Sequence, residues 1–151
     1  MKWLKRVLLL LVVLFAVAQL FRPTRANPPF DERQSLYAAT HVPPDVRAIL
    51  DRSCIDCHTS TTTWPWYSHV SPVSWWLVDH VEDGRKELNF SKWSTYSDRR
   101  RHKKLEEICE QVKEGEMPLK EYLWLHPRAK LSDADRATLC TWTESLIRSR
   151  P

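Results

Sequence analysis

Residues 54–58 read Cys54-Ile55-Asp56-Cys57-His58, and the rest of the chain is organised around this stretch. Two cysteines separated by two residues and followed directly by a histidine form the pattern of covalent c-type haem attachment. In that chemistry each thiol adds across one vinyl group of a haem, and the histidine coordinates the iron from the proximal side. The pattern therefore predicts that Cys54 and Cys57 anchor one haem and that His58 is an axial iron ligand.

Two other chemistries use a pair of cysteines at this spacing. Half of a zinc site would need a second ligand pair, but the other two cysteines, Cys109 and Cys140, stand alone in the sequence. A thioredoxin-type redox dithiol should lie between a strand and a helix, whereas the residues before Cys54 have helical periodicity and those after His58 are rich in Thr and Pro. Haem attachment is the favoured interpretation.

Composition indicates an ordinary folded protein of modest size. The chain has 151 residues, of which 42% are hydrophobic and 28% charged, and this suits one domain plus a leader. The net charge of +4 is accounted for by the four basic residues of segment 1–22, which holds no acid, so the remainder is formally neutral. This distribution gives no basic footprint for nucleic acid, and no nucleic-acid partner is expected.

The N-terminal segment resembles an export signal. Residues 7–21 are apolar apart from Gln19, and positive residues precede them. We expect residues 1–22 to form an uncleaved signal anchor or transmembrane helix, although Ala16-Val17-Ala18 also offers a cleavage site. The basic residues would stay in the cytoplasm by the positive-inside rule, and the rest would be exported.

The remainder divides into a Pro-containing tether over residues 23–42 and a haem-binding domain over residues 43–151. Apolar residues recur at helical spacing and no strand alternation is visible, so the fold class is all-α. Expected helix boundaries are the Pro43-Pro44-Asp45 start, an N-cap at Ser71 with a stop at Gly84, an N-cap at Ser97 with a stop at Gly115, and an N-cap at Ser132.

Several longer motifs accompany the cysteines. They are Trp64-Pro65-Trp66-Tyr67-Ser68, Pro72-Val73-Ser74-Trp75, Gly84-Arg85, Leu88-Asn89-Phe90-Ser91 with Trp93, Gly115-Glu116-Met117-Pro118 and Leu131-Ser132. With residues 54–58 they make the chain resemble the bacterial haem-binding domain family of small, membrane-anchored c-type cytochromes, over roughly residues 7–147. The resemblance implies a cytochrome c-like helical domain around one covalent haem. It also implies a single-pass protein of the bacterial inner membrane with the haem domain on the periplasmic side.

A haem needs apolar walls, and the chain is rich in aromatic rings. Each such ring buries on the order of 150–250 Å² in a core. The candidates for the walls are Trp64, Trp66, Trp75 and Trp76, with Tyr67 and Phe90. Arg85 or Asn89 could meet a haem propionate, but for either residue alone a solvated surface position is the favoured interpretation.

The distal iron ligand is expected to be Met117. It follows Gly115 and precedes Pro118, so a stiff loop would present its thioether at modest entropic cost. Met followed by Pro also resembles the distal loop of ordinary small cytochromes c. His80 is the main alternative, with His126 and His69 behind it.

Cys109 and Cys140 are left over, and both fall on expected apolar helix faces. We predict that they form a disulfide, with two free buried thiols as the alternative.

The favoured function is one-electron transfer with redox partner proteins of the bacterial inner membrane or periplasm, without catalytic residues. The alternatives are a haem peroxidase-like enzyme, in which His80 or Arg85 would assist at an open distal face, and a haem-based redox or gas sensor. No separate output domain is visible for a sensor, and no hydrolytic constellation occurs.

Overall fold

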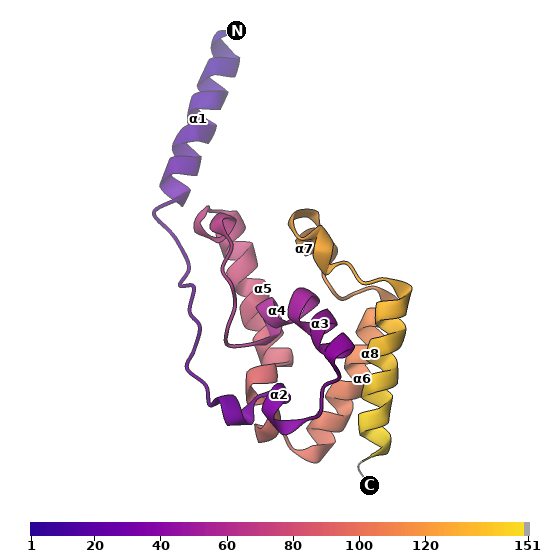
Figure 1. Cartoon of the computed structure of the whole chain (residues 1–151). Helices are drawn as coiled ribbons and strands as arrows, with labels where there is room; N and C mark the ends of the chain where they lie inside the picture. The colour runs from indigo at the N-terminus through magenta and orange to yellow at the C-terminus, as the bar shows by residue number, and fades with distance from the viewer. Residues whose placement is uncertain (150–151) are drawn as a thin grey trace.

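The computed structural model describes residues 1–149, and these residues contain helices but no strand. The elements are α1 (Lys2–Ala18), η1 (Glu32–Gln34), α2 (Leu36–Ala39), α3 (Pro44–Ser53), α4 (Ile55–His58), η2 (Trp66–His69), α5 (Val73–Glu87), η3 (Phe90–Thr95), α6 (Asp98–Glu114), α7 (Lys120–Leu125), η4 (Pro127–Ala129) and α8 (Asp133–Arg148). The all-α prediction is therefore confirmed for this part of the chain. Figure 1 shows α1 projecting from one end of the domain, with the C-terminal end of α8 at the opposite end.

The prediction of a membrane-spanning anchor, and with it that of a single-pass inner-membrane protein, is wrong. Within residues 1–149 no helix is both long enough and apolar enough to cross a membrane. Helix α1 has 17 residues and contains Lys2, Lys5 and Arg6. At ~1.5 Å per residue its length is about 25 Å, short of a hydrocarbon core of about 30 Å. The apolar run in the sequence extends to Phe21, but the helix ends at Ala18.

The core forms where α3, α6 and α8 meet. Helix α8 packs against both α3 and α6. Helix α3 turns Val46, Ile49 and Leu50 inward, as the helical spacing of these residues predicts. The other two helices contribute Leu105, Val112, Leu139 and Trp142 to the same cluster.

The observed helix ends agree with the predicted ones wherever a capping residue acts on its own end of the helix. The Ser97 side chain accepts a hydrogen bond from the backbone N–H of Arg100 and so begins α6. Gly115 ends α6 with φ of 74°, a left-handed conformation that glycine adopts without penalty. Ser132 begins α8 in a capping box with Asp135.

Helix α5 differs from its expected boundaries. It begins at Val73 rather than directly after Ser71, and it runs through Gly84 to Glu87. Gly84 is needed for packing instead of termination, because a Cβ atom there would lie 3.0 Å from the carbonyl oxygen of Cys57. Any side chain would therefore push α5 away from α4, and such overpacking typically destabilises a protein by about 1–3 kcal/mol.

Part of the segment expected to be a tether packs on the domain. Residues 32–39 form η1 and α2, both of which contact η3, and Leu36 is buried in the core. Between α1 and η1, residues 20–31 run along the outside of the domain (Figure 1). Arg85 fastens this stretch by donating hydrogen bonds to the carbonyl of Ala26 and to the side chain of Asn27.

The predicted disulfide is present. Cys109 on α6 and Cys140 on α8 are joined, with their Cα atoms 4.8 Å apart. Both residues are buried in the core cluster. The bond joins two helices, and the residues next to the two cysteines, Ile108 and Leu139, line a common cavity.

Removing this disulfide is expected to lower the free energy of unfolding by about 3–4 kcal/mol. The bond closes a loop across 31 residues of sequence separation. The loss of loop entropy in the unfolded chain gives about that value for a loop of this size. Urea unfolding of the Cys109→Ala/Cys140→Ala variant measures it. A reductant should shift the wild-type midpoint toward that of the variant and leave the variant unchanged; equal midpoints without reductant would refute the prediction.

Candidate functional site

A cavity of about 400 Å³ brings the predicted iron ligands together. His58 from α4 and Met117 from the segment after α6 both line it, and so does Cys54. The apolar part of the wall is supplied by Leu50, Leu88, Phe90, Ile108, Val112 and Leu139. A volume of this size lies within the range of small-molecule and cofactor sites, about 300–1,000 Å³.

The His58 ring is held by two backbone carbonyls. Its Nδ1 lies 3.1 Å from the carbonyl oxygen of Gly84 and 3.0 Å from that of Leu88. Because carbonyl oxygens only accept hydrogen bonds, Nδ1 must carry the proton, and Nε2 keeps its lone pair. Burial lowers the pKa of His58, although the two carbonyls oppose this, so the imidazole is neutral near pH 7. This is the state in which histidine binds a metal.

Both cysteines of the motif are free thiols. Burial raises the pKa of Cys54 to about 12 and that of Cys57 to about 11, and the carboxylate of Asp56 adds to the effect at Cys57. Reactive dithiols have lowered thiol pKa values, so these shifts argue against the redox-dithiol alternative. Among residues 1–149, no group of three or more His, Cys, Asp or Glu side chains is placed to hold a metal ion.

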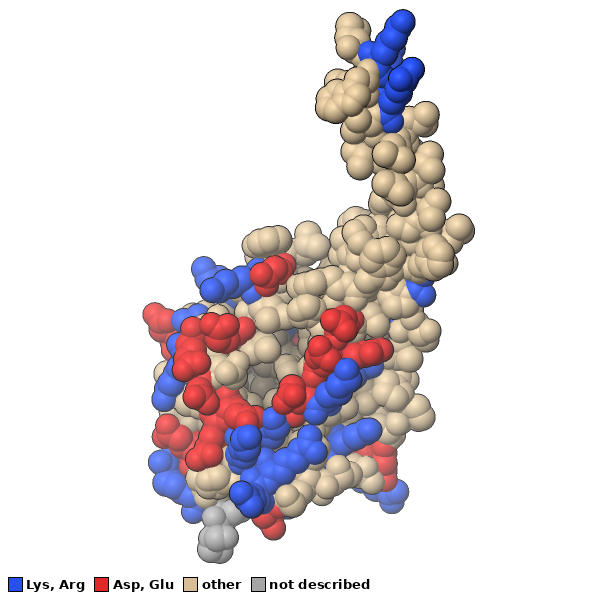
Figure 2. Space-filling model, turned by 180° about the vertical axis from the view of Figure 1, so that it is seen from behind, with Lys and Arg blue, Asp and Glu red and all other residues tan. Residues whose placement is uncertain are grey.

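Charged side chains surround the mouth of the cavity. Lys104 is nine-tenths buried, and its Nζ lies 2.6 Å from Glu107 and 3.5 Å from Glu87. The ammonium group of Lys104 lowers the pKa of Glu107. Glu110 also lines the cavity. Figure 2 shows a hollow on this face with acidic side chains on both sides.

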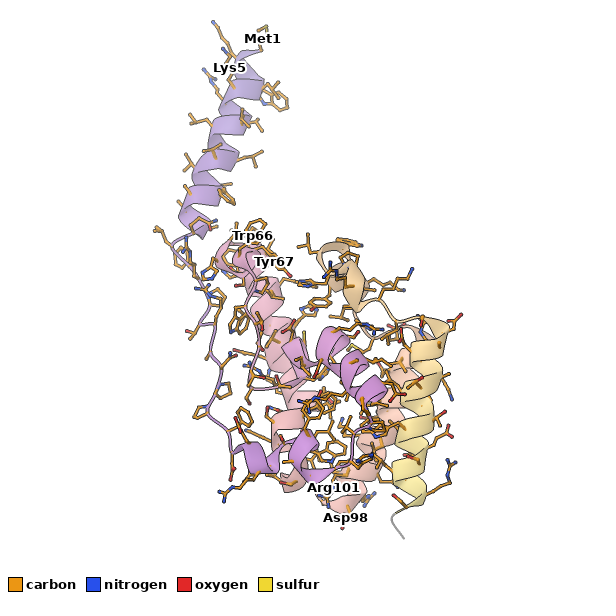
Figure 3. All side chains as sticks on the ribbon, in the orientation of Figure 1. Met1, Lys5, Trp66, Tyr67, Asp98 and Arg101 are labelled. Atoms are coloured by element: carbon orange, nitrogen blue, oxygen red, sulfur yellow. A yellow bond between two sulfur atoms is a disulfide. The ribbon has the colours of Figure 1, made fainter. Side chains whose placement is uncertain are left out.

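The four tryptophans expected to form the haem walls lie elsewhere. None of Trp64, Trp66, Trp75 and Trp76 lines this cavity. Trp66 keeps 78% of its surface exposed, and Figure 3 places it at the end of the domain from which α1 emerges. Trp75 donates a hydrogen bond to the carbonyl of Phe21. Of the expected aromatic rings, the structure brings Phe90 to the cavity.

The alternative distal ligands are engaged away from the cavity. His80 hydrogen-bonds through Nδ1 to the carbonyl of Trp76 at 2.8 Å and packs on the Trp76 ring. His126 bonds through Nε2 to the hydroxyl of Tyr67, and His69 is exposed. Met117 is therefore the candidate that the structure brings into one cavity with His58.

The two candidate propionate partners have structural roles. Arg85 donates to the carbonyl of Thr59 and to the hydroxyl of Thr62, and so fixes the loop that follows His58. Asn89 begins η3, because its side-chain oxygen accepts a hydrogen bond from the N–H of Ser91. The cavity-lining residues Lys104, Ile108 and Leu139 were missed by the sequence analysis. In the sequence these residues show only that they fall on apolar or mixed faces of α6 and α8. Core residues fall on the same faces, so the sequence does not separate the two groups.

Comparison with known proteins gives one result. A family model described as a haem-binding domain matches residues 13–145. No curated protein and no solved structure gives a significant match to the chain.

Proposed function

The chain belongs to the haem-binding domain family, and from this premise we propose that it is a c-type cytochrome that carries one covalent haem and transfers single electrons. The observation that carries the proposal is that His58, Cys54 and Met117 line a single cavity. An imidazole and a thioether are the axial pair that suits electron transfer, because the thioether raises the reduction potential.

The donor atoms fit a haem. His58 offers a free Nε2, since its Nδ1 is occupied by the carbonyls of Gly84 and Leu88. Cys54 and Cys57 are free thiols and would be the covalent anchors. Met117 would be the distal ligand. The haem supplies the four remaining iron ligands and the exchange of one electron between ferric and ferrous iron.

The chain's own residues would hold the haem in place and keep water away from it. The apolar wall formed by Leu50, Leu88, Phe90 and Leu139 would shield the ring from solvent. A buried surrounding and fixed hydrogen bonds to the axial histidine are the means by which a protein tunes a reduction potential. We also propose that electrons pass to and from redox partner proteins at the cavity mouth.

The peroxidase-like alternative has less support. Such an enzyme needs a polar side chain free to assist at the distal face. Arg85 is bound to four groups of the loop and the N-terminal stretch, and His80 is bound to Trp76. No observation favours the sensor alternative.

The experiment is a comparison of two reactions on the purified, haem-loaded full chain. An electron carrier should show a low-spin spectrum and exchange one electron reversibly in a redox titration, with negligible turnover of hydrogen peroxide. A five-coordinate, high-spin native haem with sustained peroxide turnover would replace the carrier proposal with the peroxidase-like one.

A further inference from the structure

Two hydrogen bonds from α7 and the residue after it hold the segment that follows Met117 against the haem motif and η2. Helix α7 follows Met117 closely and packs chiefly on the neighbouring η4. Figure 1 shows α7 apart from the lower parts of α6 and α8 and at the same end of the domain as η2. On the other side of Met117, Gly115 ends α6, and the backbone N–H of Met117 donates to the carbonyl of Gln111 at 3.2 Å.

Four residues form these contacts, which we call the clasp: Asp56, Tyr67, Tyr122 and His126. The Tyr122 hydroxyl donates to Oδ2 of Asp56 at 3.1 Å, and the Tyr67 hydroxyl shares a hydrogen bond with Nε2 of His126. The rings of Tyr122 and His126 stack with their centroids 4.1 Å apart and their planes inclined by 7°. Asp56 lies between the two cysteines of the motif, so the clasp joins α7 directly to the haem attachment site.

Asp56 is itself firmly placed. Its second carboxylate oxygen accepts a hydrogen bond from the backbone N–H of Thr63, and its carbonyl accepts one from the hydroxyl of Thr62. The space enclosed by the clasp and Cys57 measures only about 10 Å³. That is about the volume needed for one water molecule, so this is a packed contact rather than a second ligand site.

We propose that the clasp holds the Met117 segment over the haem, which makes Tyr122 a positioning residue for the Met117 thioether. This inference rests on the proposed function, in which Met117 is the distal ligand. The segment is fixed by α6 on one side of Met117 and by the clasp on the other, so its ends have little freedom. A ligand whose flanking chain is already ordered binds with a smaller entropic cost. Loosening the clasp should therefore weaken the bond between Met117 and the iron.

The test variant is Tyr122→Phe, which removes the hydroxyl and keeps the ring that stacks on His126. Exogenous imidazole competes with Met117 for ferric iron, so its affinity reports how firmly Met117 is held. Loss of one hydrogen bond to a charged group should make imidazole bind about tenfold more tightly to the variant than to wild type. The reduction potential should fall at the same time, because the thioether-bound fraction decreases.

Tyr37→Phe is a matched control. The Tyr37 hydroxyl donates to Oδ1 of Asp51, a tyrosine–aspartate bond of the same kind, and Tyr37 does not line the haem cavity. This variant should leave imidazole affinity and potential unchanged. The second control is the double variant Met117→Ala/Tyr122→Phe, in which the tyrosine should have no further effect because the competing ligand is gone.

Three outcomes overturn the inference. Unchanged imidazole affinity in Tyr122→Phe shows that the clasp does not act on Met117. If Tyr122→Phe raises imidazole affinity by the same factor in the Met117→Ala background, Tyr122 controls access to the iron instead. If Met117→Ala alone leaves imidazole affinity unchanged, Met117 is not the distal ligand. Both the assignment of Met117 in the proposed function and the role of the clasp are then refuted. In the first two outcomes the proposed function stands.

Discussion

Replacing both Cys54 and Cys57 with alanine is expected to abolish covalent haem attachment. Wild-type protein should keep its haem through acidified organic solvent and denaturing electrophoresis, whereas the variant should release all of it or be recovered without haem. The reason is that the two thiols are the groups that form thioether bonds in a Cys-x-x-Cys-His site. Intact-protein mass measures the result directly, since the haem mass stays on the chain only where a covalent bond exists.

The matched control removes the other two cysteines. The Cys109→Ala/Cys140→Ala variant lacks the same number of sulfur atoms, but those atoms form the α6–α8 disulfide. It should lose stability and still carry its haem covalently. Haem that survived denaturation in the Cys54→Ala/Cys57→Ala variant would disprove the assignment of the anchors.

The Cys54→Ala/Cys57→Ala variant, here the attachment variant, should also be less stable than wild type. A haem bound only by the folded state stabilises that state by mass action, and the cavity walls lose their contents when it is absent. Thermal unfolding of the two variants separates these effects, because the disulfide variant loses a cross-link and the attachment variant loses its ligand.

The sequence predicted helix ends well where the signal lies within a few residues. Ser97, Gly115 and Ser132 each end or begin a helix through their own side chain or backbone conformation, with little help from distant residues. Gly84 was misread because its role is set by Cys57, which lies close in space and 27 positions earlier in the sequence. A glycine that ends a helix and one that admits a neighbouring helix look alike in one sequence.

In the candidate site, too, the residues of a local motif could be predicted from the sequence, whereas contacts between distant residues could not. The Cys-x-x-Cys-His pattern is local, so its three residues could be named from the sequence. The carbonyls of Gly84 and Leu88 that orient His58 come from α5 and the residue after it, and no sequence pattern indicates backbone acceptors. The aromatic residue types suggested apolar walls for a haem, but residue type does not say which rings face the cavity, and Trp66, Trp75 and Trp76 are exposed. Phe90 lines the wall.

The leader was misjudged for a different physical reason. Hydropathy along residues 7–21 suggested a span, yet a span requires continuous helix of sufficient length as well as apolar side chains. The helix ends at Ala18, and the following Gln19 exchanges hydrogen bonds with the backbone of Ser71 on the domain. The end of α1 is therefore joined to the residues just before α5.

Replacing Met117 with alanine is expected to change the haem more than any other single substitution outside residues 54–58. Met117 lines the cavity with His58 and sits between an ordered helix end and the clasp. Without the thioether the iron should become high-spin or bind water, and the far-red sulfur-to-iron charge-transfer band should disappear. The reduction potential should fall on the order of 0.1–0.3 V, a fraction of the ~0.8 V that axial ligands span.

His80→Ala is the control for this substitution, since His80 was the main alternative ligand. Its ring is bonded to the carbonyl of Trp76 and lies outside the cavity, so its loss should leave the spectrum and the potential as they are in wild type. Paramagnetic resonance and a redox titration of both variants decide between the two residues. A low-spin spectrum that survives Met117→Ala and is lost in His80→Ala would assign two histidine ligands, and would require α5 to move His80 toward the iron when haem is bound.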